Sequence, residues 1–227
     1  MPHLPEFPID DTTLSLPGPA GALEVCVESP EAGVPIRPVV AVVCHPLPTH
    51  GGSMHNKVVT MAARSLREVG ITSVRFNFRG TGASTGVFDH GEGEVDDLRA
   101  VAAWVREGRP GHALWLAGFS FGAYVSLRAA ADLAPGMLIS IAPPVGRWQF
   151  AQIAIPTSPW LVIQGDEDEV VDATAVHAWL DRIDARAVRV RMPDAGHFFH
   201  RKLTDLREAI QQGVRPFLPD ASAHGYA

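Results

Sequence analysis

The sequence predicts an α/β fold in which a mostly parallel sheet of about eight strands is covered by helices on both faces. Short runs such as residues 39–44 and 113–117 are apolar throughout, which is typical of strands buried on both faces. Amphipathic stretches of helical length separate these runs along most of the chain. Regular alternation of buried strands and helices is the pattern of parallel α/β domains.

The N-terminal part of the chain has a different pattern, because it is rich in Pro and Gly up to about residue 38. Two short alternating runs, residues 12–16 and 22–27, predict strands, and the segment at 17–19 predicts the turn between them. We therefore expect a β-hairpin over residues 12–28 at the edge of the sheet.

From residue 39 onward, strands and helices are expected to alternate. A chain of 227 residues is long enough for one well-packed domain and too short for two of ordinary size. We expect one domain over residues 1–227, with a frayed tail at 221–227. The expected strands are 39–44, 71–76, 113–117, 137–141, 160–164 and 188–192, and the expected helices are 56–69, 93–107, 120–133, 173–183 and 203–214.

Charge and cysteine content restrict the classes of partner. The formal net charge is −6 and the Lys and Arg residues are scattered, so neither nucleic acid nor a membrane is an expected partner. The N-terminus has no signal-peptide pattern, and no apolar run reaches the ~18 residues of a membrane span. The two cysteines, Cys26 and Cys44, do not make a disulfide framework. These observations predict a cytoplasmic protein.

The segment Gly118-Phe119-Ser120-Phe121-Gly122 joins a predicted strand to a predicted helix. A chain that reverses this sharply brings the positions on either side of the pivot too close together for side chains, and glycine removes the clash. The serine hydroxyl is then held above the sheet, at the positive end of the following helix. The pattern predicts a nucleophile elbow with Ser120 as the nucleophile.

A serine hydroxyl is a weak nucleophile at neutral pH, so it needs a base and an acid that orients the base. The predicted strand 188–192 is followed by His197, and the predicted strand 160–164 is followed by a loop with Asp166, Asp168 and Asp172. Both loops are expected at the same sheet edge as Ser120. The choice of acid stays open at this point, because Asp172 also fits a helix N-cap and Asp166 an Asx-turn.

Stabilisation of an oxyanion requires two backbone donors, one directly after the nucleophile and one in an early loop. The first is the amide of Phe121. In the loop that begins at His45, only Leu47 can donate between the prolines at 46 and 48, because proline has no N–H. His45, His50 and His55 lack the spacing of a metal-binding motif, so no metal is expected.

Three segments, residues 113–122, 161–171 and 194–199, resemble the nucleophile, acid and histidine motifs of the α/β-hydrolase superfamily. In that superfamily the acid is the third residue after a glycine, which here selects Asp168. The sequence is further similar, at 45–57 and 75–84, to small serine hydrolases of the dienelactone-hydrolase-like branch. The resemblance extends over roughly residues 12–218. Dienelactone hydrolases proper carry cysteine where this chain has Ser120, which argues against dienelactone chemistry.

Members of the superfamily commonly insert a lid before the strand that carries the acid. Here that interval, 142–159, contains four prolines and has room for at most one or two helical turns. The resemblance therefore implies a lidless site with a shallow apolar wall from Trp148 and Phe150, unless the 81–92 loop covers it.

Other charged and aromatic residues give weaker signals. Two arginines and four acids, Arg75, Arg79, Glu92, Glu94, Asp96 and Asp97, are expected to be loop ion pairs and helix-start charges that favour the helix dipole. The alternative is a carboxylate-binding role for Arg79. No residue is assigned to substrate binding. The candidates for an apolar acyl pocket are Phe88, Phe119, Phe121, Trp148, Phe150 and Phe198.

These motifs predict a carboxylesterase-like serine hydrolase that needs no cofactor and cleaves small-molecule esters, as a monomer or homodimer. Ser120 is expected to attack the carbonyl, His197 to carry the proton, Asp168 to stabilise the imidazolium, and the Leu47 and Phe121 amides to bind the oxyanion. One alternative is a thioesterase or an amide- or peptide-type acyl hydrolase, because such a triad serves any acyl group. The other is a non-catalytic binding module with an α/β-hydrolase fold, whose usual sign is a degraded triad.

Overall fold

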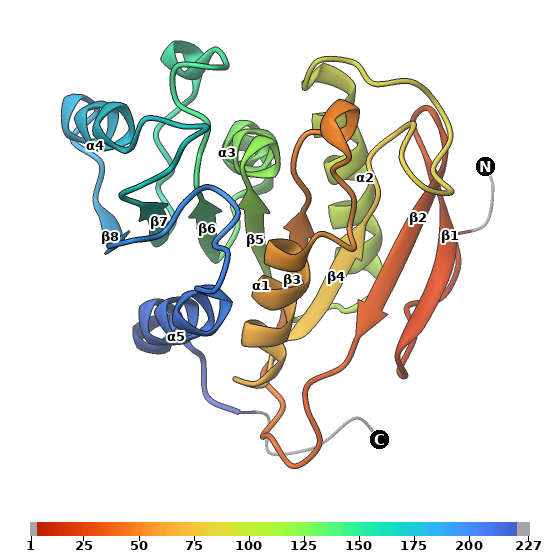
Figure 1. The fold of residues 1–227 in the computed structure, drawn as a ribbon. Coiled ribbons are helices and arrows are strands. Elements are labelled where there is room, and N and C mark those ends of the chain that lie inside the picture. The colour runs from red at the N-terminus through yellow and green to blue at the C-terminus, as the bar shows by residue number, and fades with distance from the viewer. Residues whose placement is uncertain (1–3, 222–227) are drawn as a thin grey trace.

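The computed structural model describes residues 4–221 of the protein. One eight-stranded sheet forms its centre (Figure 1). The strand order is β1-β2-β4-β3-β5-β6-β7-β8. Strand β2 is antiparallel to both neighbours, and the strands from β4 to β8 of this order are parallel. The predicted fold class is confirmed. The strands are β1 (Thr12–Gly18), β2 (Gly21–Glu28), β3 (Val39–Cys44), β4 (Thr72–Phe76), β5 (Ala113–Phe119), β6 (Met137–Ile141), β7 (Trp160–Gly165) and β8 (Ala187–Met192).

Helices cover both faces of this sheet (Figure 1). Helices α1 (Lys57–Arg67) and α5 (Leu203–Val214) pack on one face through apolar side chains such as Leu66 and Ile210. The other face is covered by α2 (Glu92–Gly108), α3 (Phe121–Leu133) and α4 (Ala173–Arg182). Burial of β3, β4, β6 and β7 along their whole length follows from this double cover. No helix within residues 4–221 is both long and apolar enough to cross a membrane.

The parallel strands end at one edge of the sheet, which places their following loops together. Cys44 at the end of β3 is paired with Gly118 near the end of β5. Gly165 at the end of β7 is paired with Met192 at the end of β8. The loops that start after these strands carry the residues singled out in the sequence.

The predicted N-terminal hairpin is present at the edge of the sheet, but its turn lies further along the chain. Residues 17 and 18 belong to β1, where Pro17 is paired with Ala22, and the turn is formed by Pro19 and Ala20. Proline is tolerated in β1 because this is an edge strand. Residues 222–227 of the predicted frayed tail lie outside the described residues.

The predicted helix starts at residues 56 and 120 are each one position early. The Asn56 side chain accepts the amide proton of Val58 at 2.9 Å, so Asn56 is the N-cap of α1. Ser120 is the N-cap residue of α3 and has non-helical backbone angles. Three other predicted elements, 39–44, 137–141 and 203–214, have the observed bounds, and the rest differ from them by one or two residues at an end.

Strand β8 forms the edge of the sheet opposite to β1 (Figure 1). Val190 and Met192 pack toward the cluster of α1 and α5. Arg189 and Arg191 alternate with them, and they pair with Asp181 and Asp166, respectively. One face of this edge strand is therefore apolar and the other is charged.

Candidate active site

Ser120 lies at the sharp turn between β5 and α3, with φ 52° and ψ −117°. Only a minority of non-glycine residues take a positive φ, and the conformation persists here because its surroundings fix it. The Ser120 amide donates to the Ile141 carbonyl on β6 at 2.8 Å. The turn thus holds the serine at the edge where the parallel strands end.

The two glycines of the turn are required by close backbone contacts. A Cβ on Gly118 would lie 2.2 Å from the carbonyl oxygen of Gly122, as the pentapeptide predicts. A Cβ on Gly122 would lie 2.3 Å from the carbonyl oxygen of Cys44, so this glycine makes room for β3 and not for Gly118. The second contact could not be inferred from the pentapeptide, because it depends on which strand lies beside β5.

A hydrogen-bonded chain connects Ser120, His197 and Asp168. His197 Nε2 lies 3.0 Å from Ser120 Oγ, and His197 Nδ1 lies 2.8 Å from Asp168 Oδ2. Ser120 is 9% exposed and His197 is 3% exposed, so the chain reaches the surface at the serine end. The structure brings together the three side chains singled out from the sequence, although they come from three separate loops.

Asp168 is held by donors other than the imidazole. Its Oδ1 accepts the amide protons of Val170 at 2.9 Å and Val171 at 2.6 Å. Its Oδ2 accepts a hydrogen bond from Gln164 Nε2 at 2.9 Å. Burial tends to raise the pKa of Asp168, but the hydrogen bond from His197 and these amides outweigh burial, so its pKa lies below the ordinary value. Asp168 is therefore a carboxylate at neutral pH.

The other two aspartates of the acid loop have different partners. Asp166 Oδ1 accepts from Arg191 Nε at 2.9 Å, so the expected Asx-turn is replaced by an ion pair with β8. Asp172 accepts the Thr174 amide proton at 2.8 Å, which confirms it as the N-cap of α4. Neither forms a hydrogen bond or an ion pair with His197.

Two further residues support this chain and were not singled out in the sequence. Gln164, the donor to Asp168, is fully buried at the end of β7, and its Oε1 has no hydrogen-bond partner within the described residues. Glu169 accepts the backbone amide proton of His197 at 2.9 Å and so ties the histidine loop to the acid loop. The acid-rich composition of the loop was the only signal that pointed to Glu169.

His45 is fully buried directly after β3. Its Nε2 accepts the amide proton of Phe78 at 3.0 Å, and its Nδ1 lies 2.6 Å from the carbonyl oxygen of Pro46. Burial lowers the pKa of His45 to about 4, although the bond to Pro46 acts in the opposite direction. The ring is neutral at pH 7, and both of its nitrogens are engaged in hydrogen bonds.

A pocket of about 370 Å³ opens beside Ser120 and His197. Leu47 and Phe121, which carry the two expected oxyanion donors, both line it. Phe121 is the first residue of α3, so its amide has no acceptor within the helix. The two residues that carry the expected donors thus both border the pocket that contains the serine.

Three of the candidate aromatic residues line this pocket and three do not. Phe121, Trp148 and Phe198 belong to its wall. The expectation for Phe150 was wrong, because it is buried against Tyr124 and Trp179 and does not line the pocket. The two other aromatic side chains away from the wall are Phe88, which packs on Phe121, and Phe119, which packs on His197.

No lid covers the pocket. The 142–159 segment contains one 3-10 turn, Phe150–Gln152, and no longer helix. The 81–92 loop is tied to the N-terminal hairpin instead, since the Thr85 amide donates to the Ala22 carbonyl at 2.8 Å. The 81–92 loop, which was the alternative candidate for a cover, therefore does not close over the pocket.

Arg79 does not reach this pocket. Its guanidinium donates to both carboxylate oxygens of Asp97, at 2.8 and 3.0 Å, and to the Gly93 carbonyl at 2.6 Å. Asp97 is fully buried. Arg79 thus forms an ion pair within the protein, as the sequence predicts. The alternative, in which Arg79 binds a carboxylate of the substrate, is excluded.

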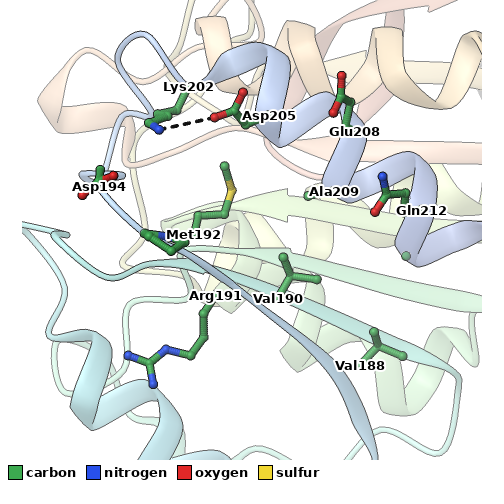
Figure 2. A pocket seen from close by; sticks show the side chains of 12 residues that line it. Val188, Val190, Arg191, Met192, Asp194, Lys202, Asp205, Glu208, Ala209 and Gln212 are labelled. Atoms are coloured by element: carbon green, nitrogen blue, oxygen red, sulfur yellow. Dashed lines mark ion pairs between the residues drawn. The ribbon is translucent and has the colours of Figure 1, made fainter.

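A larger and more open hollow of about 570 Å³ lies between β8 and α5 (Figure 2). Val188, Val190 and Met192 line it from the strand, and Lys202 and Asp205, 3.4 Å apart, line it from the helix end. No serine, cysteine or histidine lines this hollow. The smaller pocket at Ser120 is therefore the candidate active site.

Comparison with known proteins agrees with this geometry. The family described as serine aminopeptidase, S33, matches residues 41–156. An uncharacterized protein from Rickettsia prowazekii is 34% identical over 203 residues, which covers 85% of this chain and 84% of that protein. A crystal structure from Xanthomonas campestris, described as an a/b serine hydrolase without lid, is 64% identical with a TM-score of 0.93 and covers 96% of this chain and 100% of its own. An alpha-beta serine hydrolase homologue from Coxiella burnetii is 45% identical with a TM-score of 0.88, over 92% of this chain and 100% of that one.

Proposed function

The chain belongs to the serine aminopeptidase S33 family of the α/β-hydrolase superfamily and lacks a lid, and on this premise we propose that it is a carboxylesterase-like hydrolase of small esters. The observation that carries the proposal is the hydrogen-bonded chain from Asp168 through His197 to Ser120, which ends on an open pocket. A serine that is hydrogen-bonded to an oriented imidazole is the arrangement that activates an alcohol for acyl transfer.

In the first half of the proposed reaction, Ser120 Oγ attacks the ester carbonyl carbon while His197 Nε2 takes the hydroxyl proton. Asp168 stabilises the imidazolium that results, and its lowered pKa keeps it ionised for this role. The amides of Leu47 and Phe121 bind the oxyanion of the tetrahedral intermediate. The intermediate then collapses, the C–O bond to the alcohol breaks, and the alcohol leaves with the proton from His197.

In the second half, water replaces the alcohol. His197 removes a proton from the water molecule, which attacks the acyl carbon, and the same two amides again bind the oxyanion. Collapse of this second intermediate breaks the bond to Ser120 Oγ, which recovers its proton from His197. The products are a carboxylic acid and the free enzyme.

The charges around the pocket favour ester substrates over the aminopeptidase substrates that the family description suggests. An aminopeptidase must bind the ammonium group of a peptide N-terminus, for which a carboxylate is the natural partner. Among the described residues, no Asp or Glu lines the pocket. We therefore place carboxylic esters first, with thioesters and amides as the acyl compounds against which they must be tested.

The test is labelling by a fluorophosphonate probe, followed by hydrolysis of a matched ester, thioester and amide panel. We expect the label on Ser120, and Ser120→Ala should lose labelling and about 10⁴- to 10⁶-fold in kcat while remaining folded. Ser29→Ala, outside the pocket, is the matched control and should behave as the wild type. Labelling at another residue, or preferred cleavage of the thioester or amide, would overturn the esterase assignment.

A further inference from the structure

Arg147 is the only side chain with a permanent charge in the lining of the Ser120 pocket, within the part of the chain that the structure describes. The other ionisable lining residues are His50 and His197. A single cation in a pocket otherwise lined largely by apolar groups, on a chain with net charge −6, is a local exception to the charge of the molecule. Arg147 is exposed, and it also lines a neighbouring hollow that contains Glu92 and Asp132.

One hydrogen bond fixes the position of this arginine. Arg147 Nε donates to the Val170 carbonyl at 2.6 Å, and the amide of the same Val170 donates to Asp168. The guanidinium is thereby anchored to the loop that carries the catalytic acid of the proposed mechanism. This bond uses Nε and leaves the two Nη groups, and two N–H groups of a guanidinium can bind the two oxygens of a carboxylate.

Several other arginines of the protein have a carboxylate partner, and Arg147 differs from them. Arg79 is paired with Asp97 and Arg128 with Glu92. For Arg147, no ion pair with a carboxylate is present among residues 4–221. Its position in the pocket therefore leaves its charge available to a substrate.

We propose that Arg147 binds a carboxylate of the substrate, so that the preferred substrates are esters that carry a carboxylate close to the scissile bond. Half-esters of short dicarboxylic acids have this chemistry. The inference rests on the proposed esterase function and specifies its substrate class. Arg147 contacts the substrate and not the reacting atoms, so it determines specificity and takes no part in proton transfer.

Two matched substrate pairs test this inference. In the first pair the carboxylate is on the acyl chain: the half p-nitrophenyl ester of glutaric acid against p-nitrophenyl pentanoate. In the second it is on the leaving group: para-acetoxybenzoate against para-acetoxybenzamide, each followed by release of the phenol. The quantity measured is the ratio of kcat/KM for the charged ester to that for the neutral ester, in the wild type, in Arg147→Gln and in Arg186→Gln. Arg186 is exposed and outside the pocket, so its substitution removes the same charge elsewhere.

We expect the ratio for at least one pair to fall about tenfold in Arg147→Gln, mainly through KM, and to stay unchanged in Arg186→Gln. The wild-type ratio should also fall as ionic strength rises. If Arg147 only holds the Val170 loop in place, its loss should slow both esters of a pair equally. Unchanged ratios for both pairs would therefore overturn the inference. Turnover of the neutral esters would still support the esterase function in that case. Absence of turnover on every ester would overturn both proposals.

Discussion

The Nδ1 atom of the buried His45 lies 2.6 Å from the carbonyl oxygen of Pro46. Since Nε2 accepts the Phe78 amide proton, Nδ1 is the atom that carries the ring proton, and it donates to this carbonyl. The Pro46–Leu47 peptide bond is trans, so the Leu47 N–H points away from the Pro46 carbonyl. By fixing the carbonyl, His45 also fixes the direction of the proposed oxyanion donor.

Leu47→Pro should reduce kcat by about 10² to 10³, because it removes one backbone donor, whereas Leu47→Ala should retain most activity. Both variants are compared by kcat on one short-chain ester, with circular dichroism to show that each is folded. A folded and fully active Leu47→Pro enzyme would place the second donor elsewhere.

The buried His45 should also make stability depend on pH. Its pKa is about 4 in the folded protein and about 6.5 when the chain is unfolded. As pH falls below 6.5, the unfolded chain takes up a proton that the folded protein does not bind until about pH 4. The free energy of unfolding should therefore fall by an amount on the order of 3 kcal/mol across this window.

Urea denaturation at several pH values between 4 and 7 measures this effect. His45→Gln should be less stable than the wild type at pH 7 and should lose stability less steeply as the pH falls. His55→Gln, which replaces an exposed histidine, serves as the control and should keep the wild-type slope. Equal slopes in the wild type and His45→Gln would show that His45 is not the group responsible.

Asp168→Asn should be far more damaging than Asp166→Asn. Loss of the carboxylate beside His197 removes both its tautomer control and the stabilisation of its imidazolium, for which a fall of about 10⁴ in kcat is expected. Asp166→Asn breaks only a partly exposed pair with Arg191 and should change kcat little. The comparison of kcat for the two variants decides the assignment, and the opposite order would move the acid to Asp166.

The open pocket should favour short acyl chains. Each buried CH₂ group contributes ~0.8 kcal/mol, but without a lid a long chain has little surface to bury against. We expect kcat/KM for p-nitrophenyl esters to peak between acetate and hexanoate, with no rise when the substrate forms an interface. A preference for palmitate esters would require a segment that closes over Trp148 and Phe198.

The sequence was sufficient for the fold class and for Ser120 and His197, whereas the choice of Asp168 among three aspartates also needed the resemblance to the α/β-hydrolase superfamily. Buried strands and the glycines around Ser120 are local signals, and the order of the loops places His197 and Asp168 at the same edge. The contacts of His45 were not predictable in this way, because its partner Phe78 lies after a different strand and is brought close only by the pairing of β3 with β4.

The pocket wall was the least predictable part. Arg147 and Phe150 belong to the 142–159 segment, which has little regular structure, so no periodicity indicates which side chains face the pocket. Composition suggested Phe150 as wall, yet Phe150 is buried and Arg147 lines the pocket. The role of Gln164 was hidden as well, because a glutamine at the end of an apolar strand gives no sign of its contact with Asp168.

Strand β8 leaves a row of backbone amides and carbonyls without a neighbouring strand, and such edges are where separate chains join and aggregate. If two β8 strands met in antiparallel register at Val190, Arg189 of one copy would face Arg191 of the other. The contact would bring these like charges together across the new pair, where each arginine already has an aspartate partner in its own chain, Asp181 or Asp166, and gains none from the other copy. We therefore expect pairing of two β8 strands in this register to be disfavoured.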